Sequence, residues 1–76
     1  MVSMNFGTFS SWQDVIAHVR AGKEILYHAP MDWRPVIVRC HVRPSEPDIV
    51  QVDPRTMDAD PFGADSGHLT RFRRRV

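Results

Sequence analysis

The sequence has little cysteine and no long hydrophobic run. Cys40 is the single cysteine among 76 residues, so the chain cannot form an internal disulfide. The longest apolar runs span only a few residues, far fewer than the roughly 20 that a membrane-spanning helix needs. The N-terminus also lacks the basic and apolar regions of a secretory signal. Together these absences predict a cytoplasmic protein in a reducing compartment, with no membrane association.

Signals for catalysis and metal binding are missing as well. The sequence has no Gly-x-Ser-x-Gly nucleophile elbow and no phosphate-binding loop. Cys40 and His41 are adjacent, and adjacent side chains of a strand point to opposite faces, so they cannot form a nucleophile–base pair. The acidic run at 58–68 fails the calcium-loop pattern, because Phe62 occupies a ligand position and no glutamate follows. We therefore expect no enzymatic activity, no cofactor and no metal site.

The chain length and the charge pattern predict one domain with two charged segments. Seventy-six residues provide one small core, so we expect a single domain over 1–76. Residues 54–67 are predicted to form a long acidic loop, and residues 73–76 a basic C-terminal tail. The net charge is only +1, but acidic residues gather in one of these segments and arginines in the other. Such an uneven distribution of charge bears on the partners of the protein and not on its fold.

Residues 34–43 form the longest β-branched run and predict the central strand of a small sheet. Side chains alternate along a strand, which gives this segment two faces. The apolar face, which we expect to meet the helix, comprises Val36, Val38, Cys40 and Val42. The other face comprises Ile37, Arg39, His41 and Arg43. If Ile37 is buried, the sheet curls into a barrel and the basic strip shrinks. If Ile37 is exposed, the strip is open to a partner.

A helix is predicted at 11–21. Ser10 and Ser11 are both good N-cap residues, and either can form a capping box with the residue three positions later. Gly22 supplies the left-handed residue that ends a helix. Apolar residues at i, i+3, i+4 and i+7 then form one stripe, which comprises Trp12, Val15, Ile16 and Val19.

Two further strands are predicted at 24–28 and 49–53, joined to the central strand by short turns that contain proline. Such short connections require antiparallel pairing. Residues 68–72 fit either a fourth strand or a single helical turn. The predicted class is α+β, with one N-terminal helix packed on a small curled antiparallel sheet of three to four strands. An SH3-like partial barrel is the preferred architecture, and an open sheet is the alternative.

The preferred function is non-enzymatic protein binding, as an adaptor, an inhibitor or a small regulator. Proteins of this size are frequent on phages and mobile elements. Aromatic and methionine side chains around a turn have the composition of interface cores, and the acidic loop adds charge. The residues predicted to bind a protein partner are Tyr27, Met31, Trp33, Asp58 and Asp60.

The alternative function is nucleic-acid binding by a basic sheet face and the arginine-rich C-terminus, because arginine contacts phosphate and phenylalanine stacks on bases. The isoelectric point near 8.0 argues against a strongly basic domain. The residues predicted for this alternative are Arg39, Arg43, Arg71, Phe72, Arg73, Arg74 and Arg75. An exposed strand edge would also permit a homodimer.

Overall fold

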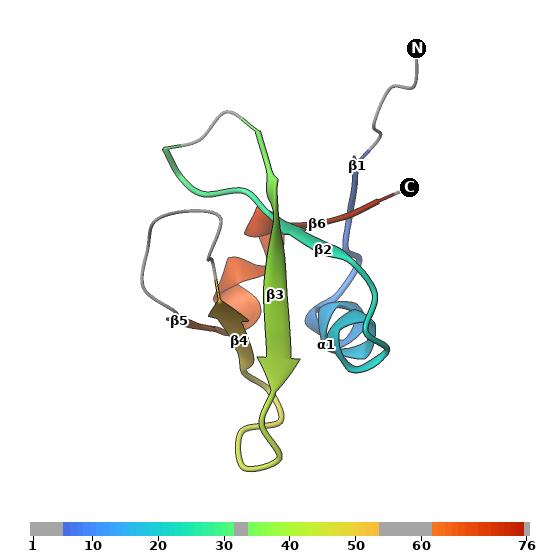
Figure 1. The fold of residues 1–76 in the computed structure, drawn as a ribbon, viewed down its shortest axis with the longest axis vertical. Coiled ribbons are helices and arrows are strands. Elements are labelled where there is room, and N and C mark those ends of the chain that lie inside the picture. The colour runs from blue at the N-terminus through green and yellow to red at the C-terminus, as the bar shows by residue number, and fades with distance from the viewer. Residues whose placement is uncertain (1–5, 32–33, 54–61, 76) are drawn as a thin grey trace.

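The computed structural model describes residues 6–31, 34–53 and 62–75, which form one antiparallel sheet, one α-helix and one 3₁₀ helix. The sheet has six strands in the order β1-β6-β2-β3-β4-β5 (Figure 1). The elements in chain order are β1 (Phe6–Thr8), α1 (Trp12–Arg20), β2 (Ile25–Tyr27), β3 (Val36–Val42), β4 (Val50–Asp53), β5 (Phe62–Ala64), η1 (Ser66–Arg71) and β6 (Phe72–Arg75).

The predicted α+β class is wrong, and with it the helix on a three- or four-stranded sheet, whether as an SH3-like partial barrel or as an open sheet. About 40% of the described residues lie in strands and about 25% are helical, so the fold is mostly β. Strands β1 and β5 were not predicted, and β6 overlaps the possible fourth strand at 68–72 only at Phe72. Each has only three or four residues and lacks an alternating β-branched pattern, so pairing with other strands defines it.

Two of these strands lie in segments that were predicted to be irregular. β5 lies within the predicted acidic loop at 54–67, where its backbone pairs with β4. β6 contains Arg73–Arg75 of the predicted basic tail and pairs with β1 on one side and β2 on the other. The arginines therefore belong to the body of the sheet and not to a tail.

The helix prediction is confirmed. The Ser11 side chain caps α1 by accepting a hydrogen bond from the Asp14 amide at 3.3 Å, which satisfies one of the free amides of the first turn. Gly22 has φ of +71°, the left-handed conformation that ends the helix without strain. The predicted stripe faces the core, with Trp12, Val15 and Ile16 buried and Val19 partly buried.

β3 is the central strand that its sequence predicts, and its two faces differ as expected. Val38 is buried, and Cys40 packs partly against the core on the side of α1. Ile37 is 46% exposed on the opposite face, so the basic strip of β3 is open.

Of the two conformations predicted for residues 68–72, the helical turn is found at 68–71, and only Phe72 belongs to a strand. η1 continues through Arg71, and β6 begins at Phe72. Asp65 starts η1 by accepting a hydrogen bond from the Gly67 amide at 2.9 Å. Phe72 is fully buried, with edge-on ring contacts to Trp12 and Tyr27, so it connects β6 to both the helix and β2. No helix in the described ranges is long and apolar enough to cross a membrane.

Candidate functional site

The structure divides the residues that were predicted to bind a protein. Tyr27 is only 6% exposed, and its ring contacts those of Phe62 and Phe72, so it is a core residue and not part of a surface patch. The aromatic character of Tyr27 serves the packing of β2 instead. Met31 is 95% exposed in the connection between β2 and β3. Trp33, Asp58 and Asp60 lie outside the described residues.

The predicted nucleic-acid residues are also divided. Phe72 is in the core and cannot stack on a base, which corrects that assignment. Arg74 shares the strand face of Phe72, and its Nε donates a hydrogen bond to the Thr8 carbonyl at 3.4 Å. Arg71 is the last residue of η1, directly before β6. Arg43 directly follows β3 and forms an exposed ion pair with Glu46 at 3.7 Å. Arg39, Arg73 and Arg75 lie on the sheet face opposite that of Phe72 and Arg74.

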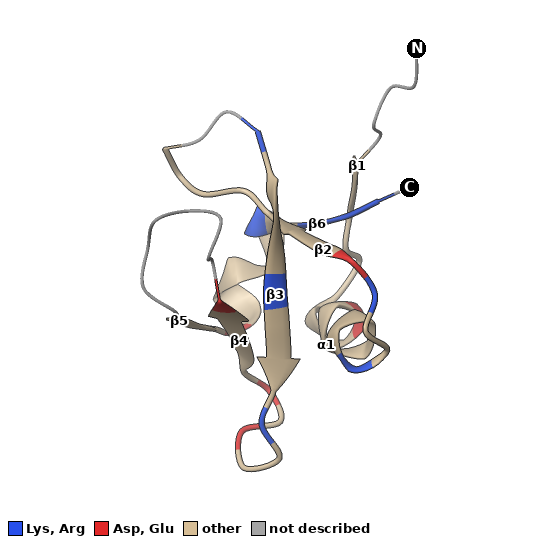
Figure 2. Cartoon of the chain, viewed as in Figure 1, with Lys and Arg blue, Asp and Glu red and all other residues tan. Residues whose placement is uncertain are grey.

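The strand register brings residues from four strands together on one face of the sheet. Across β1, β6, β2 and β3, Thr8 pairs with Arg73, Arg73 with Leu26, and Leu26 with Ile37. Directly paired residues share a face, and so do residues two positions apart in one strand. We call this surface the outer face, because it lies opposite the helix and the core; its residues are Phe6, Thr8, Leu26, Ile37, Arg39, His41, Arg73 and Arg75. Figure 2 shows its basic residues along β6 and at the middle of β3.

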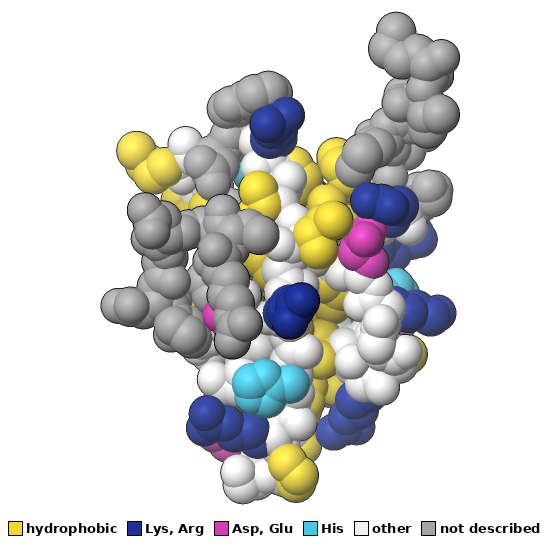
Figure 3. Space-filling model, viewed as in Figure 1, with side chains coloured by type: hydrophobic (Ala, Val, Ile, Leu, Met, Phe, Trp, Pro, Cys, Tyr) yellow, Lys and Arg dark blue, Asp and Glu magenta, His cyan; other side chains and the backbone are white. Residues whose placement is uncertain are grey.

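The outer face combines exposed apolar side chains with arginines. Phe6 is 37% exposed and Ile37 is 46% exposed, whereas Leu26 lies buried between its cross-strand neighbours. Arg75 forms an ion pair with Glu24 at 2.9 Å, and Arg39 makes no ion pair with any residue that the structure describes. In Figure 3, basic side chains on the visible face are separated by hydrophobic and neutral groups and do not form a continuous patch.

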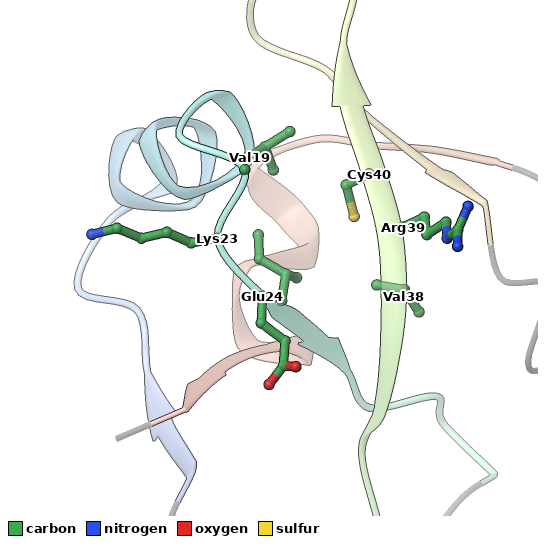
Figure 4. A pocket seen from close by; sticks show the side chains of 8 residues that line it. Val19, Lys23, Glu24, Val38, Arg39 and Cys40 are labelled. Atoms are coloured by element: carbon green, nitrogen blue, oxygen red, sulfur yellow. The ribbon is translucent and has the colours of Figure 1, made fainter.

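A groove lies beside β3, between this strand and the end of α1. Its volume is about 460 Å³, within the range of ligand sites. Its apolar lining consists of Val19, Ile25, Val38 and Cys40, and its charged lining of Lys23, Glu24 and Arg39. Figure 4 shows Val19 of α1 and Cys40 of β3 on the two sides of the groove, with the Lys23 and Arg39 side chains extending outward from it in opposite directions. No local sequence pattern predicts this groove, because the helix-to-strand spacing that forms it is a tertiary property.

The groove does not provide a nucleophile. Burial raises the pKa of the Cys40 thiol to about 12, since the low-polarity surroundings disfavour the thiolate. The thiol is therefore protonated at neutral pH and is a poor nucleophile. Among the described residues, no group of three or more His, Cys, Asp or Glu side chains is arranged to hold a metal ion.

No protein-family model, no curated protein and no solved structure matches this chain. The outer face and the groove are therefore the features from which a function can be inferred.

Proposed function

We propose that this protein is a non-enzymatic protein-binding module, an adaptor, inhibitor or small regulator, and that it binds its partner through the outer face of the sheet. The observation that carries the proposal is the exposure of Phe6 and Ile37 on a face that also presents arginines. Exposed apolar side chains cost hydration free energy, which a partner recovers by covering them.

The composition of the outer face supports a protein partner. Interface cores are enriched in aromatic residues, methionine and arginine, and depleted of lysine and acids. The outer face contains Phe6 and the three arginines at 39, 73 and 75, and Met31 lies in the connection that leads into β3. Arginine is favoured at such sites because its planar guanidinium forms several hydrogen bonds in a fixed geometry.

The test is capture of a partner from the native host by immobilised protein, followed by titration of that partner in purified form. We expect Ile37→Glu to weaken binding of the purified partner by at least about tenfold, because it places a charge at the centre of the buried contact. Gln13→Glu is the matched control. Gln13 is exposed on α1, so this substitution introduces the same negative charge away from the outer face.

The fold of both variants is checked by thermal unfolding. Ile37 is outside the core cluster, so Ile37→Glu is expected to keep a cooperative transition. Undiminished binding by a folded Ile37→Glu variant would contradict the role of the outer face.

Nucleic-acid binding is the second candidate function, favoured by one observation: the register places Arg39, Arg73 and Arg75 on one sheet face. The ion pair of Arg75 with Glu24 and the burial of Phe72 count against it. Titration of generic DNA and RNA at increasing salt separates the two functions. Micromolar binding that weakens steeply with salt would support nucleic acid, and no binding at low salt would eliminate it.

A further inference from the structure

β3 has an unpaired backbone edge along its C-terminal half. β3 pairs with β2 only at residues 36–38, whereas it pairs with β4 at residues 39–42. On the side of α1, residues 40–42 consequently have no strand partner in the part of the chain that the structure describes. Backbone groups at such an edge are a template for an added strand.

The groove lies along this open edge. Cys40 lines the groove from β3 and Val19 lines it from α1 (Figure 4). Ile25 at the start of β2 is also part of the lining. The chain leaves the end of α1 through Gly22 and enters β2 only at Ile25, so no strand lies beside Cys40 there. The volume of about 460 Å³ accommodates a bulky apolar side chain together with part of an extended backbone.

The charged rim of the groove is positive. Glu24 already pairs with Arg75 at 2.9 Å, so its charge is balanced. Lys23 and Arg39 form no ion pair with any residue in the described ranges, and both line the groove. A ligand that is complementary to this rim carries negative charge, and one that is complementary to the lining carries an apolar side chain.

We propose that the groove binds an extended acidic peptide segment of the protein partner. The segment adds a strand to the open edge of β3 at residues 40–42. One of its apolar side chains enters between Val19 and Cys40, and its carboxylates lie near Lys23 and Arg39. This proposal rests on the proposed protein-binding function and specifies the chemistry of the partner.

The first test selects binders from a random 12-residue peptide library displayed on phage, with the full chain as bait. The recovered peptides are expected to carry aspartate or glutamate on both sides of a leucine, isoleucine or phenylalanine. Peptides without acidic enrichment, or no binding peptide at all, would overturn the proposal.

Charge variants test the rim with a recovered peptide. We expect Lys23→Glu combined with Arg39→Glu to weaken binding by about tenfold or more, since two favourable charge contacts become repulsive. Arg20→Glu combined with Arg34→Glu is the matched control, because both arginines are exposed and neither lines the groove. Equal loss in the control would indicate a general dependence on net charge and would contradict the proposal.

Hydrogen exchange tests the added strand directly. Strand amides alternate in direction, so at least one of the amides of Cys40, His41 and Val42 points away from β4 and into the groove edge. That amide is expected to exchange at least tenfold more slowly when a recovered peptide is bound. Unchanged exchange at all three amides would eliminate strand addition.

The two proposals fail in different ways. A partner that binds wild-type protein and a Lys23→Glu variant equally, but not Ile37→Glu, would retain the outer face and eliminate the groove, since Lys23 lines the groove and is not part of the outer face. Preferential binding of a fatty acid or an oligonucleotide in the groove would also overturn the peptide proposal, since both are different classes of ligand.

Discussion

Phe72 shows how one residue can be assigned wrongly from its neighbours in sequence. It stands between arginines, which suggested a stacking residue in a basic tail, but its side chain is fully buried against Trp12 and Tyr27. Side chains alternate along β6, so Phe72 points into the core and the next residue, Arg73, points to the outer face.

We expect Phe72→Ala to reduce the free energy of unfolding by about 3–5 kcal/mol, because it removes a large buried ring and leaves a cavity. A loss of this size is comparable with the whole stability of a small domain. Phe72→Leu, which fills most of the space, should lose clearly less. Urea denaturation of both variants measures the difference, and a loss below about 1 kcal/mol for Phe72→Ala would contradict the assignment to the core.

Cys40 makes the stability of the protein depend on pH in the alkaline range. Its pKa is raised from 9.0 to about 12 in the folded protein by burial. Unfolding therefore releases a proton between these values, so the contribution of the thiol to stability is present below pH 9 and is lost as pH rises toward 12.

The free energy of unfolding should fall more steeply with pH for wild-type protein than for Cys40→Ala between pH 9 and 11. The extra slope is at most about 1.4 kcal/mol per pH unit. Chemical denaturation at a series of pH values provides the measurement, and Cys40→Ala controls for the other groups that titrate in this range. Parallel curves for the two proteins would show that the thiol ionises normally in the folded state.

At the scale of elements, the helix and β3 follow from local sequence, whereas the short strands do not. α1 has a cap, an apolar stripe and a terminal glycine within 12 consecutive residues, so every local signal favours the same structure. β5 has the sequence Phe-Gly-Ala, which has no strand preference. Its pairing with Val50–Val52 of β4 makes it a strand.

Gly22 ends α1 because it adopts a left-handed backbone conformation. Substitution of Gly22 tests whether this conformation, and not close packing, requires glycine. A Cβ at this position would meet nothing within 4 Å, but φ is +71°. We expect Gly22→Ala to cost about 1–2 kcal/mol of stability, from the left-handed conformation and not from a clash. Gly22→Asn should cost less, since asparagine adopts this conformation more readily. Equal costs in thermal unfolding would indicate a different cause.

At the scale of the whole molecule, β6 joins the two ends of the chain to the centre of the sheet. It pairs with β1 near the N-terminus and with β2, and thereby places the arginines of the C-terminus beside Phe6. The outer face exists only because of this pairing. Contacts between such distant residues carry a high loop-closure entropy, which favours slow folding relative to helical proteins of the same size.

Hydrogen exchange should follow the strand order. β2 lies between β6 and β3 and contains three buried residues, so its amides are expected to exchange most slowly. β1 is an edge strand with exposed residues and should exchange at least about tenfold faster. Measurement of amide exchange by NMR compares them, and equal protection of β1 and β2 would contradict the register.

The sequence by itself determined the elements whose signals are local. The spacing of Trp12, Val15 and Ile16 predicts the helix, and the alternation along 34–43 predicts the two faces of β3 and the core position of Cys40. The same alternation places Ile37 and Arg39 on the face opposite the core, but it does not predict whether Ile37 is exposed. These features depend on periods of 3.6 and 2.0 residues, which are properties of the backbone.

Only the tertiary structure decided the number of strands, the position of the arginines of β6, and the burial of Tyr27 and Phe72. The groove at the end of α1 and the open edge of Cys40–Val42 were likewise decided only by the tertiary structure. Each depends on pairing between segments far apart in the chain, whose free energy comes from burial and hydrogen bonding across the sheet. Those terms outweigh the weak local preferences of three- and four-residue segments, and no local pattern encodes them.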